Sequence, residues 1–134
     1  MKRLVCVAGF LAAVALMLGS AVAADLTVKE VMAKAHKGGT CLLVSLGKEL
    51  NADEPAWADV QKEARELVEV SSHLGKNEPP RGEKASWEKL TKEYVTNAKV
   101  LESAAEKRDK ETALASHKKL KSSCTACHNA HKPA

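Results

Sequence analysis

Apolar residues recur at every third or fourth position through most of the chain, the spacing that lines one face of an α-helix. These stripes predict four helical segments. The first begins at Leu26 and resumes with Leu42 and Leu46 after Gly38 and Gly39. Two glycines inside a helix cost roughly 2 kcal/mol together relative to alanine, so the pattern predicts a break or kink there.

The second stripe follows Asp53, which we expect to cap the helix, and Pro55, which suits a first turn. Its apolar face is Trp57, Val60, Ala64, Leu67, Ser71 and Leu74. We expect Gly75 to close this helix. The prolines of Glu78-Pro79-Pro80-Arg81-Gly82 then prevent its continuation, because they lack amide donors, and predict the main loop.

The third and fourth stripes complete the pattern. We expect Ser86 to cap the third helix and Asp109 to begin the fourth. The third stripe is Leu90, Tyr94, Ala98, Leu101 and Ala105, and the fourth is Leu114, His117, Leu120, Cys124 and either Cys127 or His128.

Four amphipathic helices with short connections predict an all-α fold, an antiparallel four-helix bundle. Its core would be thin, because many inward positions are alanine or serine and few are aromatic. Simple packing of such side chains leaves a gap between the helices, which a large flat ligand can fill.

Length and composition agree with this class of fold. A chain of 134 residues has room for one domain. Aromatic residues make up only 3% of it, far fewer than a β-sandwich or barrel needs.

Residues 1–24 have the pattern of a secretory signal peptide, which places the domain at 25–134 and the protein in the periplasm or another extracytoplasmic space. Lys2 and Arg3 precede an apolar run that is shorter than the ~20 residues of a membrane span. Without this leader, 19 basic and 17 acidic residues give a formal charge of +2. No basic block indicates nucleic acid, and no second apolar run indicates a membrane.

Three cysteines, Cys41, Cys124 and Cys127, remain after the leader and its Cys6 are removed. An odd number cannot pair completely within one chain, so a disulfide framework is a poor explanation. We expect Cys41 to be a small buried apolar residue, with an intermolecular disulfide as the alternative.

Cys124-Thr125-Ala126-Cys127-His128 matches C-x-x-C-H, the attachment signature of haem c. Two thiols one helical turn apart can form thioethers with the porphyrin vinyl groups, and the neighbouring imidazole can ligate the iron. The spacing therefore predicts one covalently attached haem, with His128 as an iron ligand.

Two other chemistries use the same residue types. A thioredoxin-like thiol pair usually lies at a helix N-terminus, where the dipole lowers the thiol pKa, whereas this motif ends a long helix. A zinc site made from Cys124, Cys127, His128 and His131 would need ligands from too wide an arc of one helix.

The leader, four predicted helices and one haem motif near the C-terminus resemble the class II c-type cytochromes, which include cytochrome c-prime and its low-spin relatives. The resemblance covers nearly all of the chain after the leader. Family members often carry an aromatic and a basic residue at the third and fourth positions after the ligating histidine. This chain has His131 and Lys132 there, so it keeps only the basic residue.

The resemblance also implies a sixth iron ligand. In low-spin relatives a methionine early in the first helix ligates the iron, within a pattern similar to Val31-Met32-Ala33-Lys34. Met32 is the expected ligand, although methionines on a helical stripe are usually core residues. His36 lies one turn later on the same face and competes with it, but we expect His36 to be solvated.

These observations predict a monohaem electron carrier that exchanges one electron with redox partner proteins, and no enzymatic activity. The alternative is an open sixth position that binds small diatomic gases, as in cytochrome c-prime. A homodimer formed through two helices is common among relatives. For the other histidines we expect His117 to be a packing or surface residue and His131 to lie beside the haem edge or in solvent.

Overall fold

The computed structural model describes residues 24–133, and this part of the chain is helical without strands. The all-α prediction is therefore confirmed. The α-helices are α1 (Val28–His36), α2 (Leu42–Asn51), α3 (Trp57–Ser72), α4 (Lys84–Glu106) and α5 (Lys110–His131), with a short 3-10 helix, η1 (Leu74–Lys76). Residues 1–23 of the expected leader, with Cys6, lie outside the described residues. None of the described helices is long and apolar enough to span a membrane.

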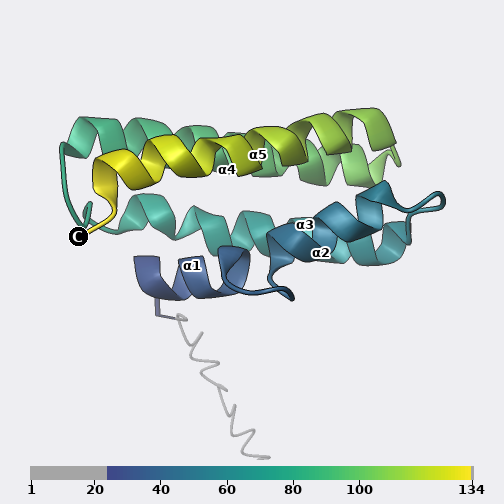
Figure 1. The fold of residues 1–134 in the computed structure, drawn as a ribbon, viewed down its shortest axis with the longest axis horizontal. Helices are drawn as coiled ribbons and strands as arrows, with labels where there is room; N and C mark the ends of the chain where they lie inside the picture. Colours follow the sequence, from purple (N-terminus) through teal and green to yellow (C-terminus); the bar gives the residue numbers. More distant parts are fainter. Residues whose placement is uncertain (1–23, 134) are drawn as a thin grey trace, which may run out of the picture.

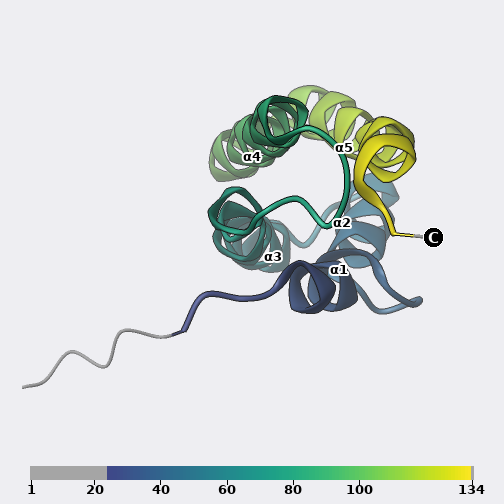
Figure 2. The ribbon, with the colours of Figure 1, turned by 90° about the vertical axis from the view of Figure 1, so that its left-hand side faces the viewer.

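Four of the helices pack in a closed ring. Helix α4 lies against α3 and α5, and α2 lies against the same two helices from the other side (Figures 1 and 2). Helix α1 packs on α2 and α3, at the lower edge of the ring in Figure 2. The short connections between successive long helices make the neighbours antiparallel, as expected for amphipathic helices that share one core.

The predicted first segment is two helices because the chain leaves the helical conformation after His36. Lys37 is extended, and Gly38 has φ of 88°, a left-handed conformation that favours glycine. Helix α2 then begins at Leu42. The expected interruption at the two glycines is confirmed, and it separates α1 from α2 completely.

The predicted helix starts are partly right. The Asp109 carboxylate accepts a hydrogen bond from the Thr112 amide and caps α5, as predicted. The predicted caps at Asp53 and Ser86 are wrong. Helix α3 begins only at Trp57, where the Ala56 carbonyl accepts the first backbone hydrogen bonds, so Asp53 lies outside the helix. Helix α4 already begins at Lys84, ahead of Ser86.

The second predicted helix also ends earlier than expected. Helix α3 stops at Ser72, and Gly75 lies inside the 3-10 turn that follows it. The Asn77 amide donates to the Leu74 carbonyl and closes this turn ahead of the two prolines. The proline-containing loop therefore begins where the sequence predicts, but a different turn leads into it.

The core is built from leucines, valines and many small side chains. The largest fully buried apolar side chains are Leu46, Leu50, Leu67, Leu101, Leu120, Val31 and Val60. Fully buried alanines at positions 35, 64, 98, 105 and 113 lie among them. Trp87 and Tyr94 are the buried aromatic residues of this part of the chain, and both belong to α4.

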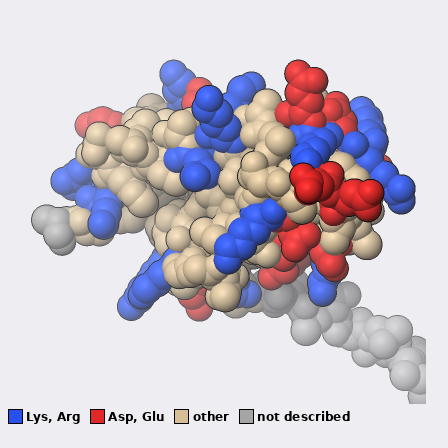
Figure 3. Space-filling view, turned by 45° about the vertical axis from the view of Figure 1, so that its right-hand side comes forward, with Lys and Arg blue, Asp and Glu red and all other residues tan. Residues whose placement is uncertain are grey.

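Charged side chains cover the outside without organising the fold. Lysines and arginines are scattered over the face in Figure 3, and acidic side chains gather mainly toward its right. The ion pairs are largely exposed, for example Lys84 with Glu78 at 2.8 Å. Exposed pairs of this kind contribute between zero and about 1 kcal/mol each. Burial of the apolar stripes is the main source of stability.

We expect Leu46→Ala to lower the free energy of unfolding by about 2–5 kcal/mol, because a fully buried leucine leaves a cavity when truncated. Val44→Ala is the matched control on the same helix, since Val44 is 39% exposed and should change stability by no more than about 0.5 kcal/mol. Denaturant titration followed by circular dichroism measures both. Equal effects of the two substitutions would contradict this description of the core.

Candidate functional site

One cleft brings together every residue that the sequence predicts as an iron ligand or haem attachment point. It lies between α1, α4 and α5 and is partly open to solvent. The lining residues are Met32, His36, Leu74, Leu90, Thr91, Glu93, Tyr94, Asn97, Ser123, Cys124, Cys127 and His128.

The free space in this cleft is smaller than the sequence predicts. Its volume is about 70 Å³, whereas pockets for ligands of ordinary size hold about 300–1,000 Å³. The side chains of α1, α4 and α5 therefore fill most of the gap expected from the small core residues. A macrocycle would need the walls of the cleft to move apart. Helix α1 is the wall best suited to move, because it is short and packs mainly on α2 and α3.

Helix α5 supplies the two thiols and the imidazole. Cys124 and Cys127 are one turn apart and half-buried, and both line the cleft with His128, whose side chain is more exposed. Residues three and four apart share one face of a helix, so the C-x-x-C-H spacing directs all three groups to one side of α5. Both cysteines are free thiols.

Burial raises the pKa of both thiols. For Cys124 this effect outweighs a backbone hydrogen bond and the charge of Lys121, which both act in the opposite direction. The pKa of Cys127 rises through burial and, to a smaller extent, through the neighbouring Cys124. Both groups are therefore thiols rather than thiolates at neutral pH, the opposite of an activated redox pair.

Helix α1 supplies the opposite wall. Met32 is half-buried and packs against the hydrophobic core. His36 is also half-buried, with Nε2 3.1 Å from the Tyr94 hydroxyl oxygen and the two rings edge to face at 5.5 Å. Burial lowers the pKa of His36, and the charge of His128 adds to this effect. The expectation of a solvated His36 is wrong, because Tyr94 covers its ring.

Tyr94 is a site residue that sequence reasoning did not single out. The pattern places it only on the apolar stripe of the third predicted helix, and it is indeed buried there. Its hydroxyl nevertheless reaches across the cleft to α1. Burial raises its pKa strongly, and negative charge on Cys124 or Cys41 would raise it further. A lone hydroxyl within an otherwise apolar stripe is the signal that could have identified it.

His131 does not line the cleft. Its side chain is only 2% exposed, and its two ring nitrogens contact the Arg81 carbonyl and the Ser86 hydroxyl. The expectation that His131 lies in solvent is therefore wrong, whereas its position relative to a haem edge stays a prediction. The loop that follows η1 folds over the end of α5 and covers this ring.

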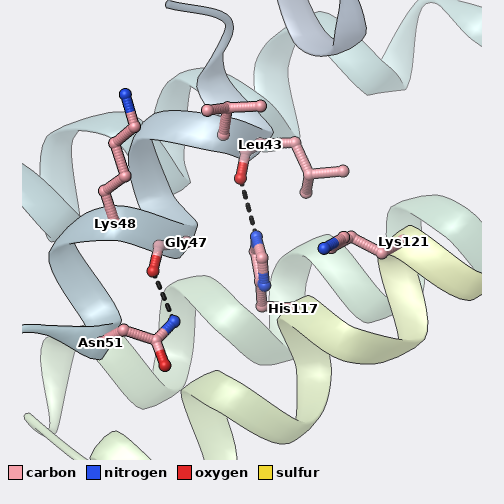
Figure 4. A pocket seen from close by; sticks show the side chains of 7 residues that line it. Leu43, Gly47, Lys48, Asn51, His117 and Lys121 are labelled. Atoms are coloured by element: carbon pink, nitrogen blue, oxygen red, sulfur yellow. Dashed lines mark hydrogen bonds between the residues drawn. The ribbon is translucent and has the colours of Figure 1, made fainter. Parts of the chain in front are cut away.

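A second groove lies between α2 and α5, next to His117 (Figure 4). His117 is buried, and its Nε2 lies 2.7 Å from the Leu43 carbonyl oxygen, as expected for a packing histidine. Its ring lies against Gly47, where a β-carbon would be 2.8 Å from Cε1. Lys48 and Lys121 flank the groove, but its lining contains no thiol or thioether and no second imidazole that could ligate a metal or attach a cofactor. The cleft between α1, α4 and α5 is therefore the stronger candidate.

Cys41 is buried immediately before α2, which confirms the prediction of a small buried residue. It does not line the cleft. Among residues 24–133, no three histidine, cysteine, aspartate or glutamate side chains form a group that could hold a metal ion by themselves.

No family model, curated protein or solved structure matches the chain. The resemblance to class II cytochromes therefore depends on the residues of the chain itself, namely the haem motif, its position near the C-terminus and the methionine on the first helix.

We expect Tyr94 to stay neutral well above pH 10, the ordinary region of tyrosine ionisation, for as long as the protein is folded, because burial raises its pKa. Since the unfolded chain ionises at the ordinary value, the stability contributed by the neutral phenol is present below about pH 10 and decreases as the pH rises further. Tyr94 is the single tyrosine, so NMR of labelled tyrosine follows it directly. Protein in denaturant is the control, and ionisation near pH 10 in the folded protein would contradict the buried position.

Proposed function

We propose that this protein is a monohaem c-type cytochrome that carries one electron at a time outside the cytoplasm. The observation that carries the proposal is the set of groups around one cleft. It gathers two thiols and an imidazole from α5 and a thioether from α1. These are the groups that covalent haem attachment and axial ligation require. Binding would widen the cleft by displacing α1 from α4 and α5.

Cys124 and Cys127 are suited to attachment as neutral thiols. Each S–H would add across one vinyl group, forming a carbon–sulfur bond while the hydrogen passes to the neighbouring vinyl carbon. The addition needs no oxidant, because atoms and electrons balance. Each thiol supplies both the sulfur and the hydrogen that the addition requires.

His128 would supply the neutral imidazole ligand, and Met32 the thioether on the opposite wall. A bound haem supplies the one-electron exchange between ferric and ferrous iron. Leu74, Leu90 and Tyr94 would exclude water from the interior of the cleft. A methionine ligand favours the ferrous state and so raises the reduction potential.

Met32 is a better candidate than His36 for the sixth ligand. The Nε2 atom of His36 is already within hydrogen-bonding distance of Tyr94, and ligation through it would break that contact. Met32 has no competing polar contact to give up, because a thioether is only a weak acceptor.

Zinc and thiol redox chemistry fit the same residues less well. Both nitrogens of His131 contact other groups, so a fourth zinc ligand from this residue would break a hydrogen bond. A thiol redox pair needs a lowered pKa, whereas burial raises the pKa of Cys124 and Cys127. Haem attachment through Cys124, Cys127 and His128 leaves the hydrogen bonds of His131 in place.

The proposed location follows from the leader pattern in residues 1–24, and the proposed partners are redox proteins. We propose no enzymatic reaction. An open sixth position that binds diatomic gases is the competing function, and the experiment on Met32 below separates the two.

Protein produced with the bacterial haem-attachment machinery should carry the mass of one haem, retained after denaturation. We expect Cys124→Ser and Cys127→Ser each to lose one thioether and with it part of the haem content, and the double variant to lose covalent haem altogether. Cys41→Ser is the matched control and should keep the haem, since Cys41 does not line the cleft. Intact-protein mass spectrometry measures every variant. Wild-type protein with both thiols free would contradict the proposal.

Met32→Ala should abolish the ferric charge-transfer band of methionine ligation and lower the reduction potential, because the thioether is lost. His36→Gln is the control on the same helix and should keep the band. Optical spectra and potentiometric titration measure both effects. A high-spin wild-type spectrum, with rapid binding of carbon monoxide to the reduced protein, would contradict Met32 ligation and favour gas binding.

A further inference from the structure

We infer that His131 is a positioning residue, which together with Arg81 and Gly82 fixes the last turn of α5 and thereby the orientation of His128. The inference rests on the proposed function, because it concerns the imidazole that would ligate the iron. It adds a role for a residue outside the cleft.

The two ring nitrogens of His131 bind different elements of the fold. Nδ1 lies 2.7 Å from the Arg81 carbonyl oxygen, and Nε2 lies 3.1 Å from the Ser86 hydroxyl. A carbonyl can only accept, so Nδ1 donates to Arg81, while Nε2 and the Ser86 hydroxyl form the second hydrogen bond. Both ring nitrogens therefore have partners in a site where the ring is almost completely buried.

The backbone of the loop meets the end of α5 at Gly82. Its φ is 81°, and a β-carbon there would lie 2.7 Å from the Ala130 carbonyl oxygen. Glycine is therefore needed for both the conformation and the close approach. The Arg81 guanidinium donates to the Asn129 carbonyl at 2.6 Å, and its positive charge suits the C-terminal end of a helix.

Trp87 gives this contact a rigid base. Its ring lies edge to face against His131 at 5.2 Å, and its Nε1 donates to the Asn77 carbonyl at 2.8 Å. Trp87 is buried in the first turn of α4. The ring of His131 is thus held between α4 and the loop of residues 77–83. The hydrogen bond from Trp87 to Asn77 joins these two elements to each other.

The consequence for His128 follows from its position. It lies three residues before His131, in the terminal turns of α5, where helices ordinarily fray. The contacts of His131 hold the backbone of this turn, and the backbone sets the direction in which the His128 side chain leaves the helix. Fixing the turn therefore orients the imidazole that lines the cleft.

The test compares haem-loaded wild type with His131→Ala, His131→Gln and His117→Ala. His117 is the matched control, because it is another buried histidine of α5 that contacts a backbone carbonyl. Ferric haem methyl NMR shifts report the orientation of the axial imidazole, and hydrogen exchange reports the opening of the last turn. We expect His131→Ala to change the methyl shifts and to speed exchange of the amides of residues 127–131 by about tenfold or more, equivalent to about 1.4 kcal/mol of local opening free energy.

Glutamine offers one donor and one acceptor, so His131→Gln should restore part of the wild-type pattern. His117→Ala should lower thermal stability while leaving the methyl shifts unchanged. If His131→Ala does not fold, Arg81→Ala is the second variant. It removes only the exposed guanidinium that donates to the Asn129 carbonyl, and it should accelerate amide hydrogen exchange at residue 129 and beyond. Wild-type shifts and exchange in the folded variants would overturn the inference, whereas absence of haem from the wild type would overturn the proposed function instead.

Discussion

Side-chain size along one face of α4 determines how the helices pack along the length of the molecule. At its C-terminal half the buried positions are Ala98, Leu101, Ala104 and Ala105, which let α3 and α5 approach. At its N-terminal half the buried positions are Trp87, Thr91 and Tyr94. The cleft lies beside this second group, where longer side chains rather than close backbone contacts fill the space between the helices.

Two buried hydroxyl groups that line the cleft already have partners within the protein. The Thr91 hydroxyl donates to the Trp87 carbonyl of its own helix, and the Tyr94 hydroxyl contacts His36. Polar groups buried without partners are costly, so these contacts reduce the penalty of placing them in a partly apolar cleft. The cysteine thiols and the Met32 thioether form few hydrogen bonds and remain available for the chemistry proposed for them.

Helical periodicity is sufficient to predict the all-α fold and the interruption at Gly38 and Gly39, because it depends on neighbours along the chain. It predicts the inward face of α5 only in part: His117 and Leu120 are buried as expected, but Ala113, Ser116 and His131 are buried as well. Contacts between distant residues cannot be predicted in this way. The contact between His36 and Tyr94 spans 58 positions, and that between His131 and Arg81 spans 50. The predicted cap at Ser86 fails for a related reason, because its hydroxyl contacts His131 rather than the backbone of α4.

Asn77 connects the two ends of the described chain. Its side-chain amide donates to the Leu26 carbonyl, while its own carbonyl accepts from Trp87, against which His131 packs. Residues 26 and 131 consequently lie at the cleft end of the molecule, and the α2–α3 and α4–α5 connections lie at the other, joined by Lys110 and the Ala52 carbonyl (Figure 1). A domain fused next to residue 26 or residue 131, or a surface tether attached there, would lie close to the cleft. A domain inserted into the Lys107–Asp109 connection would lie at the opposite end of the molecule and leave the cleft clear.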